Sequence, residues 1–220
     1  AAFEGVTGAK VLTIPSGTYR FRAAEGTSPS RGHLNIVGQE NLTVRGEEGT
    51  ILVMQSPFTN GVAVSGCTNV RLESLAVDYD PLPFTQGTIT AVEPEVMSFT
   101  IELDEGYPRT TDPQMAATNT KHRVYLYRPE TTLKLDEYFD QYVENIEPLD
   151  DNRVRITSRN EVLPAFVGKR AAMVGRRKAD AVVFHHSGDC TAYRVSVYSA
   201  PGLAFGLRGT DSIHLDRCVV

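Results

Sequence analysis

Several features are scarce in this chain of 220 residues, and each scarcity narrows the class of protein. There is no tryptophan, and the three cysteines, Cys67, Cys190 and Cys218, are widely spaced without a CxxC pair. Such spacing is poor evidence for a zinc site or a disulfide framework, so we expect three free thiols and no bound metal. No apolar run reaches membrane-spanning length, which argues against membrane insertion. The net charge of −5 argues against a nucleic-acid partner, since phosphate binding needs a basic surface.

A repeated strand–turn–strand pattern dominates what the sequence does contain. The segment Val62–Val77 aligns without gaps against Val182–Val197, 120 positions later. The pattern returns 23 residues further on in Phe205–Val220, and a partial earlier copy is Leu34–Val44. Apolar residues alternate in each copy, as in strands with one buried face. Repeats of this length, made of short strands, are typical of a β-solenoid in which each copy is one coil.

A short polar residue precedes the second strand of every copy: Asn41, Asn69, Asp189 and Ser212. Such a side chain can hydrogen-bond the neighbouring backbone and tolerates a left-handed conformation. We therefore expect these residues to turn the chain and to form a polar ladder at one corner of the stacked coils. Cys190 and Cys218 replace apolar residues of the first full copy, so both are expected to point into the core.

The repeat is interrupted between residues 87 and 178. Alternating segments such as Thr88–Val92 and Ser98–Leu103 flank a turn, and no 23-residue period runs through this region. Tyr142–Glu147 and Arg153–Thr157 are separated by Asp150–Asn152, a pattern that predicts a β-hairpin. The sequence therefore predicts an all-β protein with three parts: coils in 1–86, an inserted antiparallel β-barrel in 87–178, and coils again in 179–220.

The first chemically suggestive residues lie where the chain leaves the first full coil. Asp78 and Asp80 are two residues apart, so in an extended strand their carboxylates share one face and Tyr79 lies on the other. Two carboxylates on one face are the minimum for glycoside acid–base chemistry or for a hard cation such as Ca²⁺. The structural alternative is that both aspartates cap the junction between the coil and the insertion.

A second polar stretch, with His185, His186 and Asp189, follows the insertion. Adjacent histidines with an aspartate three residues on can orient a sugar or act as general acid and base. The alternative is an exposed turn without a role, which is common for an isolated histidine pair. The spacing offers no third ligand for a metal.

The last coil presents a further pair of polar residues. His214 and Asp216 flank an inward leucine, so we expect both to face solvent and to stack over Arg194 of the preceding coil. A column of this kind on rigid strands can present a groove to a polymer. Three tyrosines offer aromatic platforms for sugar rings: Tyr79, Tyr193 and Tyr198.

The run Asp-Tyr-Asp-Pro-Leu-Pro-Phe-Thr-Gln-Gly at Asp78–Gly87 resembles a segment of secreted bacterial right-handed parallel β-helix proteins, in particular the glycoside hydrolases that include α-1,3-galactosidases. Val11–Tyr19 is similar to the first coil of many pectin-lyase-like proteins. The resemblance implies a right-handed β-helix, a secreted, periplasmic or cell-surface location, and no cofactor, with Ca²⁺ as the alternative. In that family the catalytic aspartates lie on coils after the barrel. Because the pattern ends inside a strand at Val220, we expect further coils, and with them further catalytic residues, beyond it.

These observations predict a glycoside hydrolase that cleaves a galactose-containing or other complex oligo- or polysaccharide with paired carboxylates. The candidate catalytic residues are Asp78, Asp80, Asp189 and Asp216. The candidate substrate-binding residues are His185, His186, His214, Tyr79 and Arg194. Two alternatives stay open: a polysaccharide lyase, which uses Ca²⁺ or a basic residue to neutralise a uronate, and a non-catalytic, adhesin-like glycan binder. The sequence sets no oligomeric state.

Overall fold

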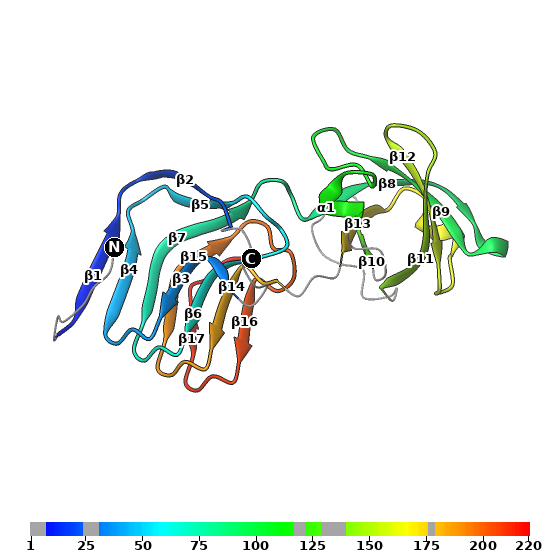
Figure 1. Cartoon of the computed structure of the whole chain (residues 1–220). Helices are drawn as coiled ribbons and strands as arrows, with labels where there is room; N and C mark the ends of the chain where they lie inside the picture. The colour runs from blue at the N-terminus through cyan, green and yellow to red at the C-terminus, as the bar shows by residue number, and fades with distance from the viewer. Residues whose placement is uncertain (1–7, 24–30, 117–121, 129–139, 176–178) are drawn as a thin grey trace. The chain divides into compact units, whose positions relative to one another are not determined.

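The chain is mostly β and divides into two compact units. The computed structural model describes residues 8–23, 31–116, 122–128, 140–175 and 179–220. One unit is formed by Ala1–Asp80 with Lys178–Val220, and the other by Pro81–Arg177. The first unit consists of parallel sheets and the second of a closed antiparallel barrel (Figure 1). The predictions of an all-β chain and of a β-barrel in its middle are therefore confirmed.

The helices found in the described part of the chain are too short or too polar to cross a bilayer.

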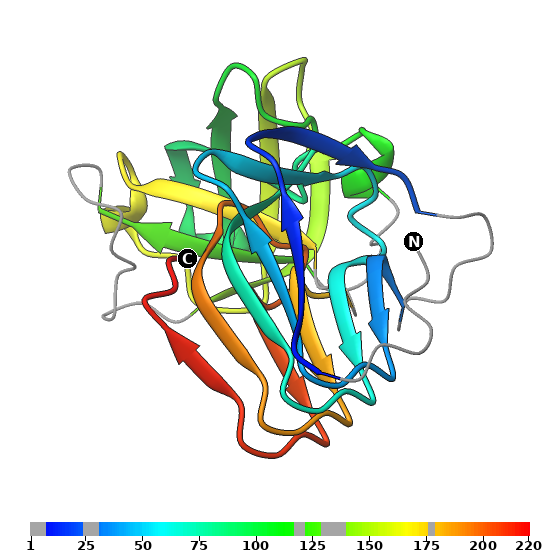
Figure 2. The same cartoon turned by 90° about the vertical axis from the view of Figure 1, so that its left-hand side faces the viewer.

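The larger parallel sheet is built from strands of successive repeats. Five strands lie side by side in the order β1 (Lys10–Ile14), β4 (Leu42–Gly46), β7 (Arg71–Tyr79), β15 (Thr191–Val197) and β17 (His214–Asp216). In Figures 1 and 2 these strands follow one another in colour from blue to red. In the same sheet β2 (Gly17–Phe21) pairs with β5 (Thr50–Met54), which pairs with the second half of β7.

The smaller parallel sheet contains the first strand of each copy, in the order β16 (Phe205–Arg208), β14 (Val182–His185), β6 (Asn60–Ser65) and β3 (Gly32–Val37). Val182 lies between Val62 and Phe205 in the register. In the larger sheet Ala192 lies between Leu72 and Leu215. The alignment across 120 positions is therefore a physical pairing, because the chain leaves for the barrel and returns to the neighbouring strand.

The inward positions of the repeat form the core of the first unit. Val62, Val64, Leu72, Phe184 and Ala192 are all fully buried. Burial of such side chains is the main favourable contribution to folding, about 1.5–3 kcal/mol for each large one. Cys67 and Cys190 are buried, Cys218 is half-buried, and all three are free thiols, as predicted. Leu207 and Leu215 occupy the same columns but are exposed, because among the described strands β16 and β17 each have a neighbour on one side only.

Left-handed residues recur at matching positions of successive copies, and one such column turns the chain at stacked corners. Asn41, Asn69, Asp189 and Ser212 have φ angles of 52–54°, and Asn69 donates a 2.7 Å hydrogen bond from its amide to Oδ1 of Asn41. The predicted corner is therefore confirmed, and its four turns form one line along the lower edge of the sheets in Figure 1. A second column bends the strands of the larger sheet: Ser74, Arg194 and Arg217, with φ angles of 52–54°.

The second unit is a closed barrel with the strand order β10–β11–β12–β9–β8–β13, all antiparallel. Its strands are β8 (Phe84–Glu93), β9 (Ser98–Leu103), β10 (His122–Tyr127), β11 (Gln141–Pro148), β12 (Arg153–Ser158) and β13 (Arg170–Gly175). The short helices are η1 (Pro94–Val96), α1 (Pro113–Ala116) and η2 (Pro164–Phe166). The predicted hairpin is β11–β12, and its turn is held by Asp150, which accepts hydrogen bonds from the N–H groups of Asn152 and Arg153.

Candidate functional site

The predicted aspartates Asp78 and Asp80 hold the end of β7, where the chain leaves for the barrel. Asp78 accepts a 2.6 Å hydrogen bond from the hydroxyl of Ser199, and Ser199 Oγ accepts the N–H of Tyr79 at 2.9 Å. Asp80 forms a 2.6 Å ion pair with Arg20. Both carboxylates therefore have partners within the first unit. These contacts favour the structural alternative, in which the two aspartates cap the junction.

Tyr79 is a core residue, contrary to the prediction that its ring binds a sugar. Its side chain is buried, with the residue only 1% exposed, and its ring packs edge-on against His33 at 6.2 Å between centroids. The hydroxyl lies 3.2 Å from the carbonyl oxygen of Thr59 and 3.3 Å from that of Asp180. Burial raises the pKa of the phenol far above its usual value. Alternation along β7 places this side chain inward, and the hydroxyl meets backbone carbonyls there.

Asp180, a residue that the sequence motifs do not single out, is a buried carboxylate where the chain returns from the barrel. The residue is 3% exposed, pairs with Arg208 at 2.5 Å and accepts the N–H of Leu203 at 3.0 Å. Its own N–H donates to Oδ1 of Asn60 at 2.7 Å. Together with the Tyr79 hydroxyl, these bonds tie the two ends of the insertion to the same unit. The sequence signal for Asp180 was the alignment of the two full copies, in which Asp180 and Asn60 occupy the same column.

Asp189 belongs to the corner column and not to a cluster with the other predicted aspartates. Its side chain is exposed, and its N–H donates to the carbonyl oxygen of Asp211 at 3.1 Å. The register places Asp189 beside Asn69, before β7 begins, whereas Asp78 lies near the end of that strand. Because an extended chain rises roughly 3.3 Å per residue, the two positions lie at opposite ends of the strand. The structure therefore does not gather the four predicted aspartates into one site.

His185 and His186 form an exposed pair at the end of β14, with their ring centroids 4.1 Å apart. His186 has a φ of 47° and occupies a column in which the other copies have a left-handed glycine: Gly38, Gly66 and Gly209. A left-handed conformation is uncommon outside glycine and recurs at functional positions. A Cβ atom at Gly209 would lie 2.8 Å from the His186 ring, so this glycine makes room for the imidazole. The replacement of glycine by histidine in this copy is the sequence signal for a candidate site.

A larger polar cluster covers the outward side of β4, β7, β15 and β17. We call it the Tyr193 surface: Arg45, Arg71, Glu73, Tyr193, Arg194, His214, Asp216 and Arg217. Glu73, Tyr193 and Asp216 form one row across three adjacent strands. His214 lies beside Thr191 and Asp216 beside Tyr193, which corrects the expectation that both stack over Arg194.

Three guanidinium groups surround the ring of Tyr193. The Cζ atoms of Arg71, Arg194 and Arg217 lie 4.5, 5.1 and 5.7 Å from the ring centroid. These distances are within the range of cation–π attraction. Arg194 directly follows Tyr193 in the chain, and Arg217 directly follows Asp216, the residue that pairs with Tyr193. Both arginines have a left-handed backbone, and their side chains reach the ring from this bend. Arg217 also donates to the Tyr193 hydroxyl at 3.4 Å. The result is a half-buried aromatic ring in a cationic frame.

Carboxylates flank this ring on both neighbouring strands. Glu73 accepts hydrogen bonds from Arg45 at 3.2 Å and from Arg71 at 3.1 Å. Partial burial pushes the pKa of Glu73 upward, but the bonds from the two arginines outweigh it and hold the pKa below its usual value. Asp216, on the other side of Tyr193, is exposed and lies 3.9 Å from Arg217. With strands about 4.8 Å apart, the Cα atoms of the two acids are separated by roughly 9–10 Å.

The arrangement suits a polar ligand with ring-shaped apolar faces and negative charge. Tyr193 offers a stacking surface, the arginines offer hydrogen-bond donors, and the acids and His214 offer groups that transfer protons. Within the described ranges, no three His, Cys, Asp or Glu side chains lie close enough together to hold a metal ion.

Comparison with known proteins returns neither a family model that matches the chain nor a matching curated protein.

Proposed function

We propose that the protein is a carbohydrate-active enzyme, a glycoside hydrolase, whose Tyr193 surface binds an acidic oligo- or polysaccharide. On this proposal the two parallel sheets are the coils of a right-handed parallel β-helix. The observation that carries the proposal is the row Glu73–Tyr193–Asp216, in which an aromatic ring framed by arginines lies between two carboxylates. Tyrosine faces stack on the apolar side of sugar rings, and arginine pairs with carboxylate or sulfate groups.

The separation of the two acids fits one class of hydrolysis. Inverting glycosidases hold their carboxyl groups about 6.5–9.5 Å apart, with room for a water, and retaining enzymes hold them closer. We assign the inverting spacing to Glu73 and Asp216 because their strands flank a third one, which puts their Cα atoms roughly 9–10 Å apart. Glu73, ionised because of its two arginines, is the base that activates water. Asp216, with His214 beside it on the same face, protonates the leaving oxygen. Asp216 thus keeps its predicted catalytic role, and Glu73 is added to it.

The rest of the proposal depends on the resemblance of Asp78–Gly87 to secreted β-helix hydrolases. It places the activity outside the cytoplasm, in a secreted, periplasmic or surface-bound protein. It also makes galactose-containing or other complex glycans the first substrates to test. No cofactor is required by an inverting mechanism that uses two carboxylic acids.

One observation favours a second reaction class. Three arginines converge on Tyr193, and a polysaccharide lyase needs such cations to neutralise a uronate before a base removes the α-proton. His214, on the row next to Tyr193, is the candidate base for this alternative. A lyase leaves an unsaturated uronate that absorbs ultraviolet light, whereas a hydrolase releases a reducing end without that absorbance.

The test combines binding and turnover on a panel of neutral and uronate-containing glycans. Tyr193→Ala is expected to weaken binding by about tenfold or more, because it removes a central aromatic anchor. The matched control is Tyr198→Ala, which removes a tyrosine that is 62% exposed and lies outside the row. Asp216→Asn and Glu73→Gln are expected to lower turnover by about 10²–10⁴-fold while binding persists.

Each outcome has a defined meaning for the proposal. Reducing ends without ultraviolet absorbance support the hydrolase, and absorbance that depends on His214 supports the lyase. Binding without turnover identifies a non-catalytic glycan binder. If no glycan binds, or if Tyr193→Ala and Tyr198→Ala weaken binding equally, the Tyr193 surface is not the site.

A further inference from the structure

His33 of β3 holds the connection between β5 and β6 at both of its ends. Its Nε2 accepts the backbone N–H of Ser56 at 3.2 Å, and its Nδ1 lies 2.8 Å from the carbonyl oxygen of Asn60. A carbonyl oxygen only accepts, so Nδ1 carries the proton and Nε2 offers its lone pair. The two bonds therefore assign the neutral Nδ1–H tautomer to this histidine. We call the segment from Ser56 to Asn60 the His33 turn.

The Asn60 end of the His33 turn is also held by the core, independently of the imidazole. Asn60 Oδ1 accepts the N–H of Asp180 at 2.7 Å, and the carbonyl oxygen of Thr59 lies 3.2 Å from the hydroxyl of Tyr79. Thr59 and Asn60 are themselves buried. At the other end, the bond to His33 is the one that the backbone N–H of Ser56 makes. The two ends therefore differ in how much they depend on His33.

A second proton on the imidazole acts in opposite ways on the two ends. At Nε2 it occupies the lone pair that accepts the N–H of Ser56, so two N–H groups would then face each other. At Nδ1 the bond to the Asn60 carbonyl becomes charge-assisted and stronger. Protonation of His33 thus breaks the bond at Ser56 and strengthens the bond at Asn60.

The surroundings of His33 provide no charge that would offset this effect. From β7 the ring of Tyr79 packs edge-on against the imidazole, and burial keeps this phenol neutral by raising its pKa. The charged neighbours in sequence or across the turn are Arg31, which is exposed, and Arg22, which donates to Gln55 at 3.2 Å. Among the described residues, no carboxylate or cation forms a hydrogen bond or an ion pair with the imidazole. Burial lowers the pKa of His33 and outweighs the bond to Asn60.

We propose that the His33 turn is a pH-sensitive switch, in which proton uptake by His33 releases the turn at Ser56 while Asn60 stays bound. The released turn binds the proton more tightly than the closed turn, because its imidazole no longer faces the N–H of Ser56. The population of the released turn therefore increases as the pH falls below about 6.5, by up to about tenfold per pH unit. The switch needs no ligand and does not depend on the Tyr193 surface.

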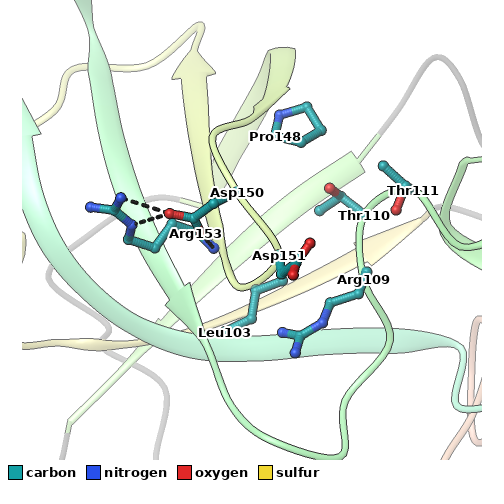
Figure 3. Close-up of a pocket in the computed structure, with 8 residues that line it drawn as sticks. All are labelled: Leu103, Arg109, Thr110, Thr111, Pro148, Asp150, Asp151 and Arg153. Carbon is teal, nitrogen blue, oxygen red and sulfur yellow. Dashed lines mark hydrogen bonds and ion pairs between the residues drawn. The ribbon is translucent and has the colours of Figure 1, made fainter.

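The barrel contains a turn of the opposite kind, which serves as an internal control. In the β11–β12 turn the side chain of Asp150 accepts the N–H groups of Asn152 and Arg153, and it also pairs with the Arg153 guanidinium (Figure 3). The hydrogen bond from the Arg153 side chain holds the pKa of Asp150 below its usual value. This carboxylate therefore stays ionised at every pH above about 4, and its turn stays closed over the range in which His33 titrates.

The test follows backbone amides of the full chain, labelled with ¹⁵N, by NMR between pH 7.5 and 5. The Ser56 amide signal is expected to titrate with a midpoint below about pH 6.5, and its protection factor to fall by up to about tenfold per pH unit. The amides of Asp180 and Asn152 are expected to keep their protection. His33→Gln is expected to abolish the titration of Ser56, because glutamine accepts a hydrogen bond without titrating. The matched control is His185→Gln, which removes an exposed histidine and is expected to leave the titration unchanged.

Three results would overturn the assignment. The first is a Ser56 amide that does not titrate, and the second is a titration that persists in His33→Gln. The third is a loss of protection at Asp180 together with Ser56, which would show unfolding of the whole unit and not the release of one turn. If His33→Gln does not fold, the ring nitrogens of the unmodified protein decide: a proton on Nε2 at pH 7.5 would contradict the switch, and a proton on Nδ1 alone supports it. None of these measurements involves a glycan, so this proposal and the proposed function fail independently.

Discussion

Replacing Tyr79 by phenylalanine distinguishes a structural role at the end of β7 from a role in binding sugar. The change keeps the buried ring and removes only the hydroxyl, which lies 3.2 Å from the Thr59 carbonyl and 3.3 Å from that of Asp180. The Asp180 carbonyl keeps the N–H of Gly61 at 3.0 Å, so the main loss is at Thr59. Leaving a buried acceptor without its donor costs about 1–3 kcal/mol.

Chemical denaturation of the full chain measures this loss. Tyr79→Phe is expected to lower the free energy of unfolding of the parallel-sheet unit by about 1–3 kcal/mol and its Tm by several degrees. Glycan binding is expected to stay unchanged. Tyr198→Phe is the control, with an expected change within about 0.5 kcal/mol because that side chain is exposed. A Tyr79→Phe protein of unchanged stability that no longer binds glycan would refute the reasoning.

Further substitutions test the corners and the pH dependence. Gly209→Ala is expected to lower the free energy of unfolding by about 1–2 kcal/mol or more, because the φ of Gly209 is 57° and the new Cβ would lie 2.8 Å from the His186 ring. Adding His186→Gly is expected to recover part of this loss, measured by urea unfolding. Asp189→Asn is expected to change stability and turnover little, since asparagine occupies this corner in two other copies. Burial lowers the pKa of His33 and outweighs its bond to the Asn60 carbonyl. As the pH falls, His33 therefore binds a proton in the unfolded chain before it does so in the folded chain. The stability of the folded chain that depends on neutral His33 is complete above about pH 6.5 and decreases below it. In His33→Gln, unfolding measured between pH 7.5 and 5 should depend less on pH; an unchanged slope would contradict the assignment.

The pairing of the parallel strands was predictable because the repeat records it directly. The alternation in Val62–Val77 and Val182–Val197 gives both the inward faces and the register. The left-handed residues between the two strands of each copy are glycine or short polar residues except for His186. The barrel was predictable as a class, but its strand order was not. The pairing of β10 with β13 and of β12 with β9 depends on long-range closure, which local alternation does not specify.

The candidate site was less predictable, for physical reasons that differ between residues. Alternation along the strand placed Tyr79 on the face opposite the two aspartates. The partners that its buried hydroxyl needs, the carbonyl oxygens of Thr59 and Asp180, are distant in sequence and were not predictable. The Tyr193 surface depends on a bend in mid-strand. Arg194 adopts its left-handed conformation without a glycine or asparagine to signal it. The register predicts that Glu73 lies in one row with Tyr193 and Asp216. The convergence of three arginines on one ring was not predictable, because it depends on the directions of their side chains.

The junction at which β7 and β15 become neighbours has a consequence for how the chain folds. Paired residues of β7 and β15 are 120 positions apart, whereas paired residues of β15 and β17 are 23 positions apart. Loop-closure entropy grows only with the logarithm of length, at about 0.6 kcal/mol per doubling, so just over two doublings add about 1.4 kcal/mol. That is close to one buried hydrogen bond. A whole folded module can thus be accommodated within a single turn of the chain, provided that residues such as Tyr79 and Asp180 hold the two ends together.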